Sequence, residues 1–140
     1  AKVGMNMICA SPKGYQPDPE ILRLAQEDAA QTGCSITVEE DIFKAAKGAD
    51  VLYTDVWTSM GEEAEREVRF KALHNYQINQ ALLNEARPEA IVLHCLPAHR
   101  GEEITEEVLE GPQSVVFDQA ENRLHVQKAI MALLMSDEVL

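Results

Sequence analysis

The 140-residue chain carries 24 acidic and 12 basic residues, giving a formal net charge of −12, and 46% of its residues are hydrophobic. This length fits one domain of the usual roughly 100–200 residues, and the hydrophobic fraction disfavours intrinsic disorder. Nucleic-acid binding is disfavoured because neutralising phosphates requires clustered lysine and arginine. The three cysteines form no C-x-x-C pair, which excludes a zinc ribbon, and free thiols fit a reducing, cytoplasmic compartment. The apolar runs are too short to cross a membrane.

The first part of the chain predicts short apolar strands that alternate with helices. Proline and aspartate at residues 17–19 mark a helix start, and Gly33 marks its end. The expected elements, in chain order, are a strand at 3–10, a helix from 17–19 to 33, a strand at 35–38, a helix at 41–48 and a strand at 51–54.

The second part of the chain continues the same alternation. Acidic residues at the start of a charged segment favour a helix there, because they interact well with the helix dipole. The expected elements are a loop at 58–61, helices at 62–73 and 75–86, a strand at 90–93, a short helix at 105–109, a strand at 114–117 and a closing helix at 119–135.

This alternation predicts an α/β fold, in which a parallel sheet is covered by helices on both faces. Ligands of such sheets bind at the carboxyl ends of the strands. Three segments follow predicted strands and carry reactive side chains, at 55–61, 94–101 and 118–123. The phosphate-binding glycine motifs of nucleotide sites are absent, so the sequence gives no support to a nucleotide cofactor.

The segment 55–61 combines a carboxylate, a hydroxyl and a glycine. Asp55 is suited to hold an ammonium group, Ser59 offers a hydroxyl, and Gly61 permits close approach of the backbone. The alternative is an ordinary loop between a strand and a helix, in which Ser59 or Asp55 caps the helix.

The segment 94–101 places a thiol beside two imidazoles and a guanidinium. Cys95 is a candidate nucleophile, proton acceptor or polar contact, and His94 or Arg100 could lower its pKa. Pro97 makes a cis peptide bond possible. Two alternatives stay open: a buried cysteine with satisfied histidines, and a metal site formed by His94, Cys95 and His99.

Arg123 is expected in the first turn of the last helix, where a basic residue interacts unfavourably with the helix dipole. This placement indicates that Arg123 binds an anion, because a guanidinium binds phosphate or carboxylate with two hydrogen bonds. The alternative is an ion pair with Glu121 or with another of the many acidic residues.

Taken in order, the segments 55–61 (DVWTSMG), 94–103 (HCLPAHRGEE) and 121–123 (ENR) resemble the ornithine carbamoyltransferase family, and 11–15 (SPKGY) resembles a turn in the same family. The resemblance runs along nearly the whole chain. It implies a Rossmann-like parallel sheet that lacks the first strand of the family's second domain. Residues 1–140 are then the ornithine-binding, carboxyl-terminal domain, incomplete at its start, and the carbamoyl-phosphate domain is absent.

The resemblance also implies roles for individual residues. Cys95 is the catalytic residue, as the proton acceptor, and it also contacts ornithine. Asp55, Ser59 and Met60 bind ornithine, while Cys95, Leu96 and Arg123 contact carbamoyl phosphate, with His94 as a further candidate. The scheme requires no metal and no organic cofactor. Aspartate carbamoyltransferases resemble this domain too, but they typically carry proline at the position of Cys95.

The function implied is transfer of the carbamoyl group from carbamoyl phosphate to the side-chain amine of L-ornithine, which gives L-citrulline and phosphate. The Ser-x-Arg-Thr-Arg phosphate motif of the family's first domain is absent, so this chain alone is expected to be inactive. The expected partners are the two substrates, the missing amino-terminal domain and further copies in a trimer. Two alternatives stay open: a truncated non-catalytic binding or interaction module, and a carbamoyltransferase for a different amine.

Overall fold

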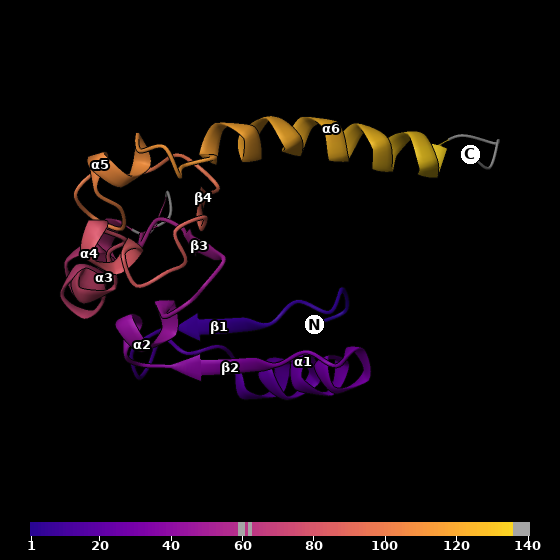
Figure 1. Cartoon of the computed structure of the whole chain (residues 1–140), viewed down its shortest axis with the longest axis horizontal. Coiled ribbons are helices and arrows are strands. Elements are labelled where there is room, and N and C mark those ends of the chain that lie inside the picture. The colour runs from indigo at the N-terminus through magenta and orange to yellow at the C-terminus, as the bar shows by residue number, and fades with distance from the viewer. Residues whose placement is uncertain (59–60, 62, 136–140) are drawn as a thin grey trace.

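The first unit of the chain is a strand, a helix and a parallel strand (Figure 1). The computed structural model describes residues 1–58, 61 and 63–135. Strand β1 (Met7–Ala10) pairs in parallel with β2 (Ile36–Glu39), and helix α1 (Pro19–Thr32) connects them. The Asp18 carboxylate accepts hydrogen bonds from two backbone N–H groups of the first turn, and Gly33 ends the helix in the left-handed conformation, at φ 74°. These caps explain why the helix begins and ends where the sequence predicts.

The second unit is built on another parallel pair, which carries the residues of greatest chemical interest. Helix α2 (Ile42–Ala46) leads into β3 (Val51–Thr54), which pairs with β4 (Ile91–His94). The register aligns Thr54 with His94, so the two strands end at the same level. The connection between them contains η1 (Glu63–Glu65), α3 (Arg66–Leu73), η2 (His74–Tyr76) and α4 (Gln80–Leu83).

The helix expected at 75–86 is shorter in the structure. Asn79 has an extended backbone, and its side chain accepts a hydrogen bond from the N–H of Leu82, so it caps α4 immediately before Gln80. Hydrophobic spacing alone predicts one helix over this segment, but the Asn79 cap starts a separate helix within it.

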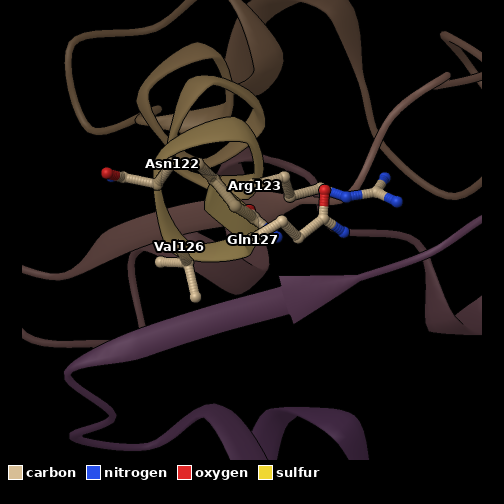
Figure 2. A pocket seen from close by; sticks show the side chains of 5 residues that line it. Asn122, Arg123, Val126 and Gln127 are labelled. Carbon is tan, nitrogen blue, oxygen red and sulfur yellow. The ribbon is translucent and has the colours of Figure 1, made fainter. Parts of the chain in front are cut away.

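The chain ends with α5 (Glu106–Leu109) and α6 (Val116–Met135). Figure 1 shows α6 extending away from the remainder of the fold, and Figure 2 shows side chains along one part of it. Most of its apolar side chains are exposed, including Leu124, Val126, Ile130 and Leu133. Exposure of a long apolar surface is typical of a face that another body covers.

The expected strand at 114–117 is wrong. Ser114 forms only an isolated parallel bridge with Val92, and helix α6 already begins at Val116. The N–H of Gln119 donates to the carbonyl oxygen of Val115, which starts the helical hydrogen-bond pattern. A short apolar run is compatible with a strand or with the start of a buried helix, and here it forms the start of a helix.

Parallel strands and connecting helices confirm the predicted α/β class. Instead of one continuous sheet, the described residues form two sheets of two strands each. Helix α2 contacts β1, β2 and α4, and so it joins the two units.

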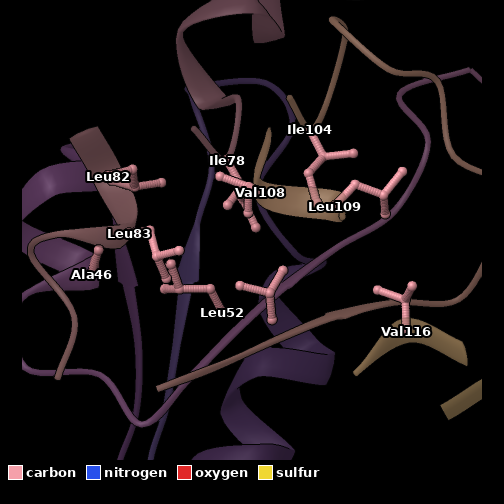
Figure 3. Close-up of a cluster of buried hydrophobic side chains, with 10 residues drawn as sticks. Ala46, Leu52, Ile78, Leu82, Leu83, Ile104, Val108, Leu109 and Val116 are labelled. Carbon is pink, nitrogen blue, oxygen red and sulfur yellow. The ribbon is translucent and has the colours of Figure 1, made fainter. Parts of the chain in front are cut away.

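The hydrophobic core lies around β3 and β4 (Figure 3). Leu52 and Val92 from the strands pack with residues from α4, α5 and the start of α6; the other members are Ala46, Ile78, Leu82, Leu83, Ile104, Val108, Leu109 and Val116. In β1, by contrast, Met7 and Ile8 are exposed. The best-packed part of the chain is therefore the part that fixes the ends of β3 and β4. Among the described residues, no helix has the length and apolar character needed to cross a membrane.

Candidate active site

Asp55 and Cys95 meet at the carboxyl ends of β3 and β4. Each residue directly follows its strand, and the Thr54–His94 register places them side by side. The Cys95 thiol donates a hydrogen bond to Asp55 Oδ1, with 2.9 Å between the sulfur and the oxygen. The sequence-based expectation that chemistry gathers at this sheet edge is therefore met by a direct contact between two of the predicted residues.

The environment of Cys95 keeps its thiol protonated. Burial raises the pKa of the Cys95 thiol, and the hydrogen bond and negative charge of Asp55 raise it further. The expectation that His94 or Arg100 lowers this pKa is wrong. His94 bonds to Glu103 and to the Leu96 N–H, and the Arg100 guanidinium pairs with Glu110 at 2.6 Å.

Tyr53 is a third member of this site that the motif analysis missed. It lies two residues before Asp55 on β3, and therefore on the same side of the strand. Burial, followed by the proximity of Cys95, raises the pKa of the Tyr53 hydroxyl. The period of two along the strand was the available signal, because it places Tyr53 and Asp55 on one face.

A buried histidine–glutamate pair supports the loop that carries Cys95. The N–H of Leu96 donates to His94 Nδ1 at 2.9 Å, so the ring proton lies on Nε2 and is donated to Glu103 Oε1 at 3.0 Å. Both side chains are fully buried, and the same carboxylate oxygen accepts the backbone N–H of His99 at 2.6 Å. The pair thus holds Leu96, which has φ 55° and precedes the cis peptide bond to Pro97.

This arrangement decides one alternative left open by the sequence. Both ring nitrogens of His94 are engaged, so His94, Cys95 and His99 do not form a metal site in this geometry. His94 acts instead as a satisfied core histidine. Glu103 is its partner, and motif reasoning gave Glu103 no role because its burial is a property of the fold.

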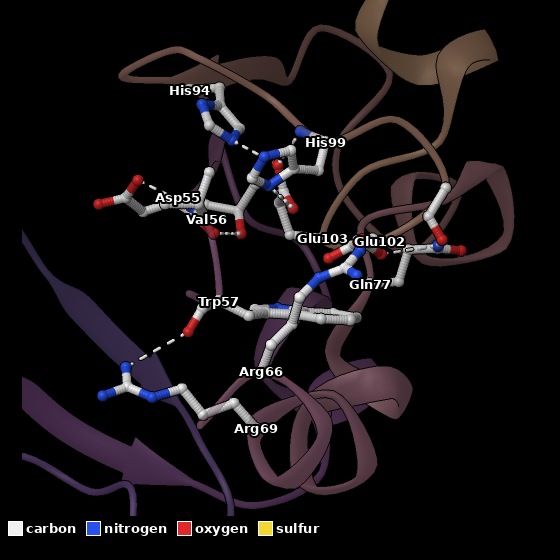
Figure 4. Close-up of polar contacts among 12 residues, drawn as sticks. Asp55, Val56, Trp57, Arg66, Arg69, Gln77, His94, His99, Glu102 and Glu103 are labelled. Atoms are coloured by element: carbon white, nitrogen blue, oxygen red, sulfur yellow. Dashed lines mark hydrogen bonds and ion pairs between the residues drawn. The ribbon is translucent and has the colours of Figure 1, made fainter. Parts of the chain in front are cut away.

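The loop after β3 is fixed from the side of α3 (Figure 4). Trp57 is buried and packs edge-to-face on Phe70, with 5.6 Å between the ring centroids. Arg69 donates a hydrogen bond to the carbonyl oxygen of Trp57 at 3.3 Å. Among the described residues, Asp55 accepts from the N–H of Val56 and from the Cys95 thiol, so it caps no helix that the structure describes. Ser59 and Met60, which were predicted to bind ornithine, lie outside the described residues.

Arg123 lies on α6 at an open hollow of about 280 Å³ (Figure 2). Gln119, Asn122, Arg123, Val126 and Gln127 line this hollow. Because α6 begins at Val116, Arg123 is about two turns inside the helix, and the argument from the first-turn dipole is wrong.

Arg123 nevertheless remains a candidate for binding an anion. Glu121, its expected ion-pair partner, bonds instead to His125 at 2.9 Å. Within residues 1–58, 61 and 63–135, the Arg123 guanidinium makes no hydrogen bond or ion pair. Neither Asp55 nor Cys95 lines the hollow.

The contact between Asp55 and Cys95 predicts how fast the thiol reacts. Because burial and Asp55 raise its pKa, Cys95 should be alkylated slowly by iodoacetamide at neutral pH, and the rate should increase as pH rises past the ordinary thiol pKa. Asp55→Asn removes the negative charge and should shift this rate profile to lower pH. Peptide mass spectrometry distinguishes Cys95 from Cys9 and Cys34.

Asp50→Asn is the matched control, since Asp50 precedes β3 at its other end and pairs with Arg87 at 2.7 Å. Its rate profile for Cys95 should equal that of the unchanged protein. An unshifted profile for Asp55→Asn would contradict the account of this site.

Comparison with known proteins supplies the family. The model of the family described as aspartate/ornithine carbamoyltransferase, Asp/Orn binding domain, matches residues 1–134. Ornithine carbamoyltransferase from Gloeobacter violaceus is 60% identical over 135 residues, which cover 96% of this chain and 43% of that protein. The enzyme of the same name from Thermococcus kodakarensis is 54% identical and is covered to 42% of its length.

Solved structures agree with this assignment. Ornithine carbamoyltransferase from Pyrococcus furiosus matches 94% of this chain with a TM-score of 0.89 and 52% identity, and 42% of that chain is covered. An N-acetyl-L-ornithine transcarbamylase matches with a TM-score of 0.79 and 33% identity. The chain spans less than half the length of the curated relatives it matches. A family match over residues 1–134 together with the shared fold shows that this chain belongs to the aspartate/ornithine carbamoyltransferase family.

Proposed function

We propose that this chain is the ornithine-binding part of an ornithine carbamoyltransferase, which makes L-citrulline and phosphate from L-ornithine and carbamoyl phosphate. The observation that carries the proposal is the hydrogen-bonded pair of Asp55 and Cys95 at the ends of β3 and β4. It is supported by 60% identity to a relative with that name.

Ornithine is preferred over other amines because of the similarity. Curated relatives named ornithine carbamoyltransferase are 50–60% identical to this chain, and solved structures of ornithine enzymes are 36–54% identical, whereas the N-acetyl-L-ornithine enzyme is 33% identical. In this proposal Ser59 and Met60 hold the α-amino acid end of ornithine, and Asp55 attracts its ammonium groups by opposite charge.

Cys95 is proposed to act on the amine that attacks. An ammonium group must lose a proton before its nitrogen can attack the carbonyl carbon of carbamoyl phosphate. In the described site the thiol is protonated and bonded to Asp55. A bound ammonium beside the pair offsets the charge of Asp55 and lowers the thiol pKa, so that the Cys95 thiol releases its proton to solvent water. The resulting thiolate then accepts one proton from the ammonium group, which leaves a neutral amine and restores the thiol.

Leu96 is proposed to contact the carbamoyl group through its carbonyl oxygen. Its N–H is already donated to His94, so the carbonyl is the backbone group it can offer to the NH₂ of the substrate. The buried pair of His94 and Glu103 thereby positions a substrate contact without touching substrate itself.

Arg123 is proposed to bind the phosphate of carbamoyl phosphate. Its guanidinium has no partner among the described residues, and guanidinium groups bind phosphate with two parallel hydrogen bonds. One cation is a small part of a phosphate site, so we propose that an amino-terminal domain supplies the others. A trimer and a cytoplasmic location belong to the same proposal.

The function is tested by a turnover assay on the complete protein that contains this chain. Carbamoyl phosphate is supplied with L-ornithine, N-acetyl-L-ornithine or L-aspartate, and the carbamoylated product is measured. We expect citrulline to form with the highest kcat/KM. Preference for another amine, or ornithine binding without turnover, would contradict the proposal; the latter would indicate a non-catalytic binding module. The 140-residue chain alone should give no citrulline.

Asp55→Asn tests the amine site within that enzyme. Loss of a hydrogen-bonded charge costs about 2–3 kcal/mol, so kcat/KM for ornithine should fall about 30-fold to 160-fold. The KM for carbamoyl phosphate should change little. Asp50→Asn serves as the control and should leave both constants unchanged, whereas an unaltered kcat/KM for ornithine in Asp55→Asn would exclude the proposed role.

Arg123→Gln tests the phosphate contact. We expect the KM for carbamoyl phosphate to rise about tenfold or more, because one charge-assisted contact is lost. Arg123→Lys should recover only part of the affinity, since lysine cannot bind with two parallel hydrogen bonds. Arg23→Gln removes an exposed arginine that pairs with Glu20 on α1 and is the control. Equal KM values for Arg123→Gln and Arg23→Gln would show that Arg123 does not bind this substrate.

A further inference from the structure

His99, Glu102 and Glu103 gather three metal-binding side chains in the loop after β4 (Figure 4). One ligand atom from each lies within 4.8 Å of the other two. Among the described residues, no other group of three or more histidine, cysteine or acidic side chains lies close enough together to share a metal ion.

Glu103 gives this cluster a feature that a surface acidic cluster lacks. Its side chain is fully buried, and its Oε1 accepts hydrogen bonds from His94 and from the His99 N–H. Its Oε2 is also buried, has no hydrogen-bond partner in the part of the chain that the structure describes, and lies 3.9 Å from His99 Nδ1. A buried carboxylate oxygen without a partner lowers the stability of the folded state. A positive charge or a hydrogen-bond donor on the side of His99 would remove this penalty.

We propose that His99 Nδ1, one oxygen of Glu102 and Oε2 of Glu103 bind a divalent transition-metal ion, with water completing its coordination. One imidazole nitrogen and two carboxylate oxygens suit Mn²⁺ or Zn²⁺. His94 would hold the other oxygen of Glu103, as residues around metal sites commonly hold a ligating carboxylate. The site lies outside the Asp55–Cys95 pair, and it does not depend on the function proposed above.

The cluster must contract slightly to bind an ion. Ligand atoms at about 2.1 Å from a shared metal lie roughly 3–3.5 Å apart. Glu103 is held in place by its hydrogen bonds, whereas the side chain of His99 is 51% exposed and free to rotate toward it. Occupancy would therefore fasten His99 to the core and stiffen the loop that begins at Cys95.

Arg66 is the competing cation at this site. Its guanidinium bonds to Glu102 Oε1, and its side chain is 61% exposed. A metal ion that takes up Glu102 must bind beside this positive charge or displace it. Removal of Arg66 should therefore strengthen metal binding. If the Arg66–Glu102 ion pair had only a structural role, its removal would not strengthen metal binding.

The test titrates the full chain with Mn²⁺ and follows bound metal by electron paramagnetic resonance, without substrates. Mn²⁺ prefers oxygen and nitrogen donors, so the three free thiols do not compete. We expect one saturable ion per chain, and pulsed spectra that show coupling to an imidazole nitrogen.

Three variants decide the outcome. His99→Ala should weaken binding at least about tenfold and remove the nitrogen coupling. Arg66→Gln should tighten binding about twofold to fivefold, the size of an exposed ion pair. His125→Ala is the matched control, because His125 pairs with Glu121 on α6 at 2.9 Å, outside the cluster.

The proposal is overturned if Mn²⁺ shows no saturable binding, if the bound ion lacks nitrogen coupling, or if His99→Ala binds as tightly as His125→Ala. Circular dichroism confirms that the exposed substitutions leave the fold intact. Should His99→Ala fail to fold, the Arg66→Gln titration decides, because unchanged or weaker binding there contradicts a site that includes Glu102.

Discussion

The parallel register of β3 and β4 is the constraint on which the candidate site depends. Because Thr54 aligns with His94, the next residues on the two chains, Asp55 and Cys95, lie within hydrogen-bond distance. The core holds this register, since Val92 is fully buried and Leu52 nearly so. A slip of one strand by one residue would turn the buried apolar side chain of that strand toward solvent, and it would also separate the thiol from the carboxylate.

Two kinds of burial then prepare the residues at these strand ends. Partial burial, together with Asp55, raises the pKa of the Cys95 thiol. Complete burial of His94 and Glu103 fixes one imidazole tautomer and the backbone of Leu96. In the proposed function, this chain organises the amine side of the site. Arg123, the proposed phosphate contact, lies exposed on α6, and the chain spans 43% of a relative's length.

The sequence predicted the parts of this arrangement that follow from local rules. Short apolar runs located β3 and β4, and the rule that ligands bind at the carboxyl ends of strands singled out Asp55 and Cys95. What it missed depends on tertiary contacts. The direction of the Cys95 pKa shift depends first on burial of the thiol and then on its contact with Asp55. The role of Glu103 depends on its burial beside His94, and the start of α6 was hidden because an apolar run such as 114–117 fits either a strand or a helix.

The measurement that tests the central claim most directly is the protonation state of Cys95 with and without L-ornithine. Thiolate absorbance in the ultraviolet is recorded against pH for the complete protein, and the spectrum of Cys95→Ser is subtracted. If the ammonium of ornithine enters the Asp55–Cys95 pair, its positive charge should shift the thiolate transition to lower pH. A transition that ornithine leaves unchanged, at saturating ornithine, would contradict the claim that this pair is where the amine is bound and deprotonated.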